Sequence, residues 1–235
     1  AQLTTVREQI ERDLADPDAK RRKIATACFL IDAFCLRVGD EKDPDEADTV
    51  GATTLRPEHV TLHDDGLAEF RFLGKDSVLW HKKLEIPEVV AQNLEELVQN
   101  ARPSRRNDGK RHPSRDKPQL FPDISSRNVK AYLSDILTGL SAKVFRTHHA
   151  HIAVRESLHA AAVEADDPEH VTWEAANLAN LEAAELCNHT KKAPESWPRS
   201  RLRYRERRQK AEARAKTYRE RLTEQRQALA DLRKE

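Results

Sequence analysis

Four short segments of the chain place a cationic or imidazole side chain near glycine, serine or asparagine. They contain Arg37, Lys75, Arg146 and His189, which lie far apart in the sequence. An arginine fork donates several hydrogen bonds to phosphate oxygens and keeps its charge at any relevant pH. Lysine and histidine side chains donate hydrogen bonds and can transfer protons. Together these residue types are suited to chemistry at a phosphate.

Taken singly, each of these residues has an ordinary structural interpretation. Arg37 falls at the end of a predicted helix, where a positive charge complements the helix dipole. Lys75 lies in a Gly-Lys-Asp turn, Arg146 lies in an amphipathic helix with a charged face, and a single His189 is usually a surface or core residue. Only the presence of all four segments in one chain favours a common site.

The elements that must hold these residues can be predicted from hydrophobic spacing. Apolar residues separated by three and four predict a helix over residues 18–37, with Asp16 as its cap and Pro17 at its first position. The charged stretch 38–56 contains helix breakers and predicts an irregular loop.

A period of two follows that loop. It predicts strands at 59–62, 67–73 and 77–86, joined by a turn at 64–66 and a second turn at 74–76. The result is a small three-stranded antiparallel sheet with Lys75 at a hairpin tip.

Helical spacing returns after the sheet. The expected helices cover residues 88–100, 126–139, 142–164 and 168–188, while residues 101–118, with three prolines, predict a flexible surface loop. The predicted fold is therefore mainly α with a small antiparallel sheet, an α+β class.

A boundary follows at Pro194 and Pro198, and the chain beyond it predicts one long charged helix with a heptad seam, typical of a coiled coil. Residues 191–235 hold 16 basic and 7 acidic side chains, whereas residues 1–190 hold 25 and 33. A basic segment of this kind favours a polyanionic partner. We expect a core domain over 1–192 and a basic arm over 193–235.

Composition excludes several other classes. The 235 residues have a net charge of +1, contain no apolar run of membrane-spanning length and open with no signal segment, so we expect an intracellular protein. The cysteines Cys28, Cys35 and Cys187 form no C-x-x-C pair, which argues against a disulfide framework and a zinc site. His148, His149 and His151 do not share one helical face, so they do not favour a metal site either.

The four segments resemble the motifs of eukaryotic-type (type IB) DNA topoisomerase I, and they occur in that family's order. The matching stretches are Leu36-Arg37-Val38-Gly39-Asp40-Glu41-Lys42 with Glu46-Ala47-Asp48-Thr49-Val50-Gly51, Phe72-Leu73-Gly74-Lys75-Asp76-Ser77, Gly139-Leu140-Ser141-Ala142-Lys143-Val144-Phe145-Arg146-Thr147, and Leu186-Cys187-Asn188-His189. The basic arm resembles the start of the family's linker.

The resemblance implies a function in which supercoiled DNA is relaxed by transient single-strand cleavage. It implies that Arg37, Arg146 and His189 surround the scissile phosphate and that Lys75 protonates the leaving oxygen. It also implies the fold shared by topoisomerase IB and tyrosine-recombinase catalytic domains, double-stranded DNA as partner, and no need for ATP or metal. The residues expected to bind DNA are Asp76, Lys143, Asn188, Lys191 and Lys192.

The family's nucleophile is a tyrosine in a Ser-Lys-x-x-Tyr setting after the linker. Tyr132, Tyr204 and Tyr218, the three tyrosines of this sequence, do not lie in that setting. We therefore expect the nucleophile, like the family's N-terminal clamp region, to lie outside these 235 residues or on a separate chain. The expected compartment is the nucleus in a eukaryote and the cytoplasm or nucleoid in a prokaryote.

Three other functions remain open from the sequence. A non-catalytic DNA-binding protein would keep the phosphate-binding residues without the nucleophile, and it would bind duplex DNA with a steep salt dependence. A coiled-coil interaction module would act through the arm at 196–235. A site-specific tyrosine recombinase is the nearest enzymatic alternative, although the stretches at 36–51 and 72–77 resemble the topoisomerase more.

Overall fold

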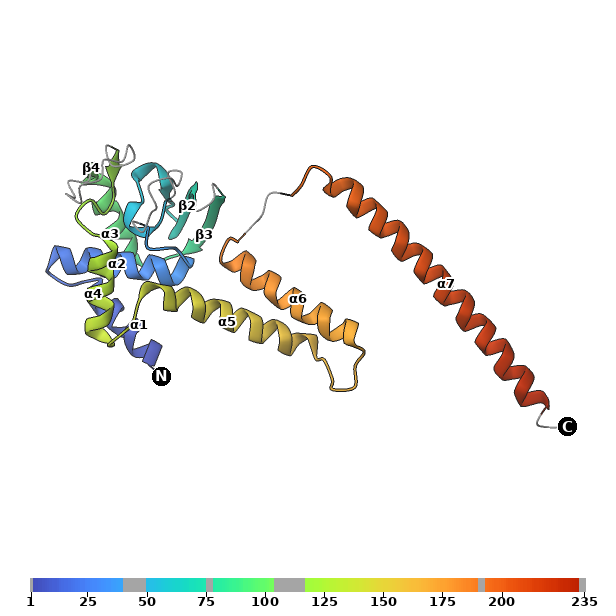
Figure 1. The fold of residues 1–235 in the computed structure, drawn as a ribbon. Coiled ribbons are helices and arrows are strands. Elements are labelled where there is room, and N and C mark those ends of the chain that lie inside the picture. The colour runs from blue at the N-terminus through green and yellow to red at the C-terminus, as the bar shows by residue number, and fades with distance from the viewer. Residues whose placement is uncertain (1, 40–49, 75–77, 104–116, 190–192, 233–235) are drawn as a thin grey trace. The chain divides into compact units, whose positions relative to one another are not determined.

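A computed structural model describes residues 2–39, 50–74, 78–103, 117–189 and 193–232 (Figure 1). The chain forms two compact units, residues 1–190 and residues 191–235. The predicted fold class is confirmed, because the first unit combines helices with a three-stranded antiparallel sheet and the second contains one long helix. The functional meaning of this division stays a prediction.

A buried central helix organises the first unit. α1 spans Gln2–Asp13, and α2 spans Ala19–Phe34 and contacts α1, α3, α4 and α5. The helix begins one residue later than expected, because the carboxylate of Asp18, and not that of Asp16, accepts the backbone N–H of Lys20 and acts as the cap. It also ends three residues earlier than expected. Cys35 adopts a left-handed conformation (φ 55°), so Arg37 lies beyond the helix and not in its last turn.

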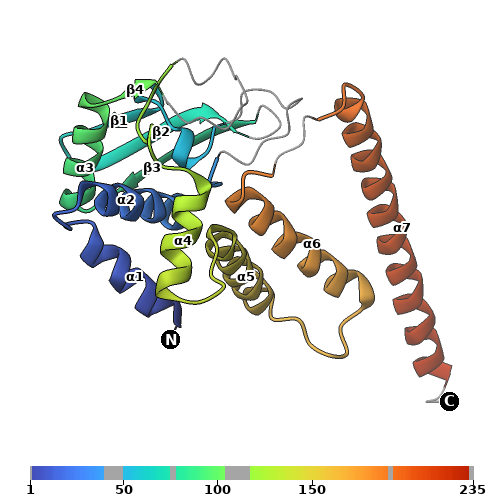
Figure 2. The same ribbon diagram turned by 60° about the vertical axis from the view of Figure 1, so that its left-hand side comes forward.

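The predicted antiparallel sheet is present next to α2 (Figure 2). Its strands are β1 (Val60–Leu62), β2 (Leu67–Leu73) and β3 (Leu79–Glu85), in the order β1-β2-β3. The Phe70 side chain is buried against Phe34 of α2, with ring centroids 4.5 Å apart. Because alternate side chains of β2 face the helix, the sheet and α2 share one core.

Further elements complete that core. Two short 3-10 helices, η1 (Ala52–Thr54) and η2 (Pro57–His59), precede the sheet, and α3 (Glu88–Gln99) and α4 (Ser126–Ile136) follow it. The stretch predicted as a flexible loop is not irregular at its ends, because β4 (Arg102–Pro103) pairs with β5 (Pro118–Gln119). That pairing was not predicted from the prolines of this stretch.

The last two helices of the first unit form an antiparallel pair, which Figure 1 shows side by side. α5 spans Ala142–Ala161 and α6 spans Glu169–Leu186, and the small buried residues of α6 are Ala175 and Ala179. Small side chains let the two helix backbones approach closely. The pair returns the chain to the start of α5, which brings residues 187–189 beside that helix.

The second unit contains α7 (Trp197–Leu232), which confirms the predicted long helix. None of its described residues is buried, and the seam residues Tyr204, Tyr218 and Leu232 are more than half exposed. Ion pairs along its surface, including Arg208 with Glu212, are spaced by four residues and support the helix locally. A partner for the seam stays a prediction.

Candidate DNA phosphate site

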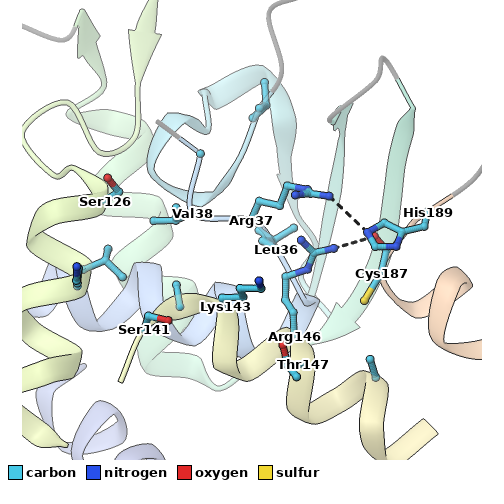
Figure 3. A pocket seen from close by; sticks show the side chains of 16 residues that line it. Leu36, Arg37, Val38, Ser126, Ser141, Lys143, Arg146, Thr147, Cys187 and His189 are labelled. Atoms are coloured by element: carbon cyan, nitrogen blue, oxygen red, sulfur yellow. Dashed lines mark hydrogen bonds between the residues drawn. The ribbon is translucent and has the colours of Figure 1, made fainter. Parts of the chain in front are cut away.

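A pocket of about 630 Å³ is lined by α4, by the start of α5 and by the segments that follow α2 and α6. Four of its described lining residues carry a positive charge and none is acidic, which is the composition of an anion site. Arg37, Arg146 and His189 come from three distant segments and point toward one another (Figure 3). The cationic lining residues are Arg37, Lys130, Lys143 and Arg146.

The backbone that carries Arg37 is fixed by a second segment. The N–H of Ala52 donates to the carbonyl of Arg37 at 2.8 Å, and the N–H of Thr53 donates to the carbonyl of Val38 at 2.8 Å. A Cβ added at Gly51 would lie 2.4 Å from the Cα of Gly39 and 2.7 Å from the Arg37 oxygen. Glycine is required at 51 because the two backbones nearly touch. The glycines of the two resembling motifs therefore position the arginine.

Arg146 projects from the second turn of α5. Its Nη2 donates to the carbonyl oxygen of Cys187 at 3.0 Å, while its Nε is buried and has no hydrogen-bond partner among the described residues. Burial lowers the pKa of Arg146, and the positive charge of Arg37 lowers it further. A buried, incompletely bonded guanidinium next to a second one would gain from an anion.

His189 is held by the way α6 ends. The N–H of His189 donates to Ala184 at 2.7 Å and the N–H of Asn188 donates to Glu185 at 3.0 Å, which is the bonding of a Schellman motif. Asn188 occupies its left-handed position (φ 53°), which asparagine tolerates better than most residues. Its side-chain amide also donates to the carbonyl of Leu79 at 3.1 Å. These bonds fix the backbone of His189 against β3.

The Arg37 and His189 side chains meet at the edge of the pocket. Nη2 of Arg37 lies 3.4 Å from Nε2 of His189 (Figure 3). A guanidinium only donates, so Nε2 can accept from Arg37 when the proton of the neutral imidazole is on Nδ1. The contact orients the two side chains toward each other.

The remaining sequence predictions are only partly placed. Lys143 lies on α5 and lines the pocket, and its contact with DNA stays a prediction. The residues Lys75, Asp76, Lys191 and Lys192 lie outside the described part of the chain. The hairpin that carries the first two is described up to the N–H of Gly74, which donates to the carbonyl of Val78 at 2.8 Å.

Two cationic residues near the site were missed from the sequence. Lys130 lies on α4 one turn after Ser126, and both line the pocket, so their spacing of four was the available signal. Lys82 lies on β3 two positions after the buried Trp80, on the same face of the strand. The available signal was the alternation of the strand, which places Lys82 on the face of Trp80 and the exposed His81 and Lys83 on the other face.

A family model described as "Eukaryotic DNA topoisomerase I, catalytic core" matches residues 1–222. The chain belongs to this family. The match to topoisomerase I extends from the first unit into α7, so it includes the residues that line the pocket and residues 197–222 of α7.

Individual relatives agree with the family. The chain is 36% identical over 201 residues to the rat protein named DNA topoisomerase I, mitochondrial, which covers 83% of this chain and 32% of the relative. It is 36% identical over 187 residues to DNA topoisomerase 1 of Schizosaccharomyces pombe, and this match covers 80% of this chain and 21% of the relative. It is 34% identical over 202 residues to human DNA topoisomerase 1, and this match covers 83% of this chain and 24% of the relative. The chain spans at most about a third of the length of these relatives.

Two further observations concern alternative sites. Within the described ranges, no group of three or more His, Cys, Asp and Glu side chains is arranged to hold a metal ion. His149 of the histidine run instead lies 2.6 Å from the carboxylate of Asp32. None of the helices described here has the length and apolar character needed to cross a membrane.

Proposed function

We propose that residues 1–192 form the DNA phosphate site of a type IB topoisomerase that relaxes supercoiled DNA by cutting and rejoining one strand, with residues 193–235 as its linker arm. The observation that carries this proposal is the convergence of Arg37, Arg146 and His189 on one pocket without an acidic lining residue in the described structure. The family supports the same assignment. We also propose that double-stranded DNA is the partner and that the protein acts inside the cell.

The two arginines would stabilise the charge that develops on the scissile phosphate. When a tyrosine oxygen attacks phosphorus, the non-bridging oxygens gain negative charge, and Arg37 and Arg146 approach them from different segments. Their guanidinium groups are held in place before the substrate arrives, which avoids reorganisation during the reaction. Loss of one preorganised donor of this kind typically costs about 3–4 kcal/mol, or roughly 10²–10³ in rate.

His189 would supply another hydrogen bond. In the site without DNA its Nε2 lies 3.4 Å from Nη2 of Arg37. A bound phosphate oxygen is a better acceptor for the guanidinium than an imidazole nitrogen, because it carries charge. The imidazole would then donate one ring N–H to a non-bridging oxygen.

Lys75 is the proposed general acid. It would give a proton to the 5′-oxygen as the bond between phosphorus and that oxygen breaks. The new bond joins the 3′-phosphate to the tyrosine oxygen, whose own proton passes to water. Religation reverses these steps, and the phosphotyrosine keeps the bond energy, so we propose that neither ATP nor metal is needed. The further proposed DNA contacts are Asp76, Lys143, Asn188, Lys191 and Lys192.

The tyrosines of the sequence support a nucleophile located elsewhere. The hydroxyl of Tyr132 donates to Asp13 at 2.7 Å, and burial with this hydrogen bond raises the pKa of the phenol. A buried phenol bonded to a carboxylate is a poor nucleophile. Tyr204 and Tyr218 lie on α7, outside a Ser-Lys-x-x-Tyr setting. We propose that a separate segment supplies the nucleophile.

Plasmid relaxation in EDTA without ATP tests the proposal. The 235-residue chain alone should bind duplex DNA and leave a supercoiled plasmid unrelaxed, and addition of a segment carrying Ser-Lys-x-x-Tyr from a relative should restore relaxation. Arg146→Ala should reduce both binding and restored relaxation. Arg155→Ala, an exposed change on the same helix, is the matched control.

The alternative functions give different results. Duplex binding that depends on Arg146 but never leads to cleavage with any added tyrosine segment would indicate the non-catalytic DNA-binding protein. Relaxation by the chain alone would show that the nucleophile is Tyr132, Tyr204 or Tyr218, and mapping the covalent DNA adduct would identify it.

A further inference from the structure

Lys82 holds the ends of two helices that belong to different parts of the chain. Its Nζ donates to the carbonyl of Phe34 at 3.4 Å and to the carbonyl of Leu186 at 3.2 Å. Phe34 is the last residue of α2 and Leu186 is the last residue of α6. The carbonyls at a helix C-terminus lack intrahelical partners and carry the negative end of the dipole, so one ammonium group satisfies both ends.

The two bonded carbonyls have the same relation to the site. Arg37 follows Phe34 by three residues, and His189 follows Leu186 by three residues. Each segment leaves its helix through a left-handed residue, Cys35 in one and Asn188 in the other. The side chains at the far ends of the two segments then meet at 3.4 Å. Lys82 thus binds both chain segments at the same distance in sequence, three residues before Arg37 and three residues before His189.

The surroundings of Lys82 fit a structural cation and not a surface charge. Its Nζ lies 4.8 Å from the centre of the Trp80 ring, and it forms no ion pair with a described carboxylate. Burial is the main cause that lowers the pKa of Lys82, opposed by the thiols of Cys35 and Cys187. A half-buried ammonium is costly unless its donors are used. Two donors of the Lys82 ammonium are used by the carbonyls at the ends of α2 and α6.

We propose that Lys82 is a positioning residue that sets the distance between Arg37 and His189 by tying the C-termini of α2 and α6 together. The inference deepens the proposed function and rests on it, since the pair it positions is the one assigned to the phosphate. Without the ammonium, two negative helix ends would face each other with unsatisfied carbonyls. The segments that lead to Arg37 and His189 would then separate.

The test compares Lys82→Met, Lys82→Arg and Lys83→Met in the 235-residue chain. Lys83 is the neighbouring exposed lysine on β3, so its variant controls for the loss of one charge from the strand. The first measurement is the imidazole ¹H–¹⁵N spectrum of His189 without DNA, which reports the Arg37 contact directly. We expect Lys82→Met to displace these signals, and Lys82→Arg and Lys83→Met to retain them.

The second measurement is a double-mutant cycle with His189→Ala, read as affinity for a short DNA duplex. If Lys82 acts through His189, the effect of His189→Ala should shrink by about threefold or more in the Lys82→Met background, as expected for residues of one network. A purely structural role would lower the thermal midpoint and leave the two effects additive.

Each outcome decides the proposal. Unchanged His189 signals in a folded Lys82→Met variant would overturn it, as would full additivity in the cycle. If Lys82→Met does not fold, Lys82→Arg decides: wild-type signals support the proposal, and a folded variant with displaced signals contradicts it. If His189→Ala leaves duplex affinity unchanged in the wild type, the proposed function fails, and the spectra still test the positioning role.

Discussion

Nη2 of Arg37 lies 3.4 Å from Nε2 of His189, although the two residues are 152 positions apart in the sequence. Two different backbone devices make this contact possible. Arg37 is held by the hydrogen bonds of its segment to residues 52 and 53, and His189 by the Schellman motif that ends α6. The site therefore depends on backbone geometry as much as on the charged side chains.

Gly51→Ala should disrupt the arginine segment. The added Cβ would lie 2.4 Å from the Cα of Gly39, and neither backbone can move without breaking the bonds that hold Arg37. Overpacking of this kind costs about 1–3 kcal/mol. Urea unfolding should show a loss in this range, together with weaker duplex binding. Gly74→Ala, where the nearest atom would be 3.6 Å away, should leave the free energy of unfolding nearly unchanged.

An oxyanion should stabilise the folded chain through the pocket. Two guanidinium groups without a lining carboxylate in the described structure repel each other until an anion binds. Sulfate at about ten times its dissociation constant should add about 1.4 kcal/mol of stability. The measurement is the thermal midpoint in sulfate and in chloride of equal ionic strength. A sulfate effect that survives unchanged in Arg37→Ala and Arg146→Ala would contradict the assignment of the pocket.

Asp32→Asn should remove a pH-dependent contribution to stability. The Asp32 carboxylate is paired with Arg7 at 2.6 Å and His149 at 2.6 Å. Burial alone would raise the pKa of Asp32, but hydrogen bonds from His149 and Arg7 outweigh it and lower the pKa. A lowered carboxyl pKa stabilises the fold above about pH 4, the unfolded value, and this stabilisation is lost as the pH falls through the folded pKa.

Urea unfolding at pH 6 and at about pH 3 checks this prediction. At pH 6 the variant should be less stable by about 1–3 kcal/mol, the usual cost of unpaired buried partners. The difference from wild type should shrink at the lower pH, because Asp32 then carries less charge. Asp135→Asn, at an exposed position of α4, should show little difference at either pH. A constant difference for Asp32→Asn would show that its charge does not matter.

Tyr132→Phe should weaken the fold and spare the chemistry. The lost hydrogen bond to Asp13 should cost about 1 kcal/mol in the free energy of unfolding. Relaxation restored by an added tyrosine segment should continue at the wild-type rate, measured well below the thermal midpoint. Loss of the covalent DNA adduct in this variant, with the fold intact, would make Tyr132 the nucleophile and refute the proposed division.

Local patterns predicted the sheet better than the site. The alternation of residues 67–73 gave the bounds of β2 correctly, because each side chain on that strand faces either the core or the solvent. The end of α2 was wrong, because Cys35 adopts a left-handed conformation that no local pattern signals for a cysteine. As a result Arg37 was assigned to a helix end.

The role of Lys82 could not be predicted for a different reason. Its two acceptors are the main-chain carbonyls of residues 34 and 186. Every residue has such a carbonyl, so the residue types at these positions do not indicate the contact. Its lysine type and strand position give no information about which helix ends will converge on it. Contacts of this kind depend on the tertiary arrangement of α2, β3 and α6.

The Schellman motif at the end of α6 has a consequence for the entropy of substrate binding. The main-chain bonds of Asn188 and His189 leave only the side-chain torsions of His189 to be ordered when a phosphate arrives. Fixing a backbone residue costs about 1–2 kcal/mol, and here that cost is incurred once, during folding. The backbone of His189 is therefore already ordered, and substrate binding needs to fix only the orientation of the imidazole.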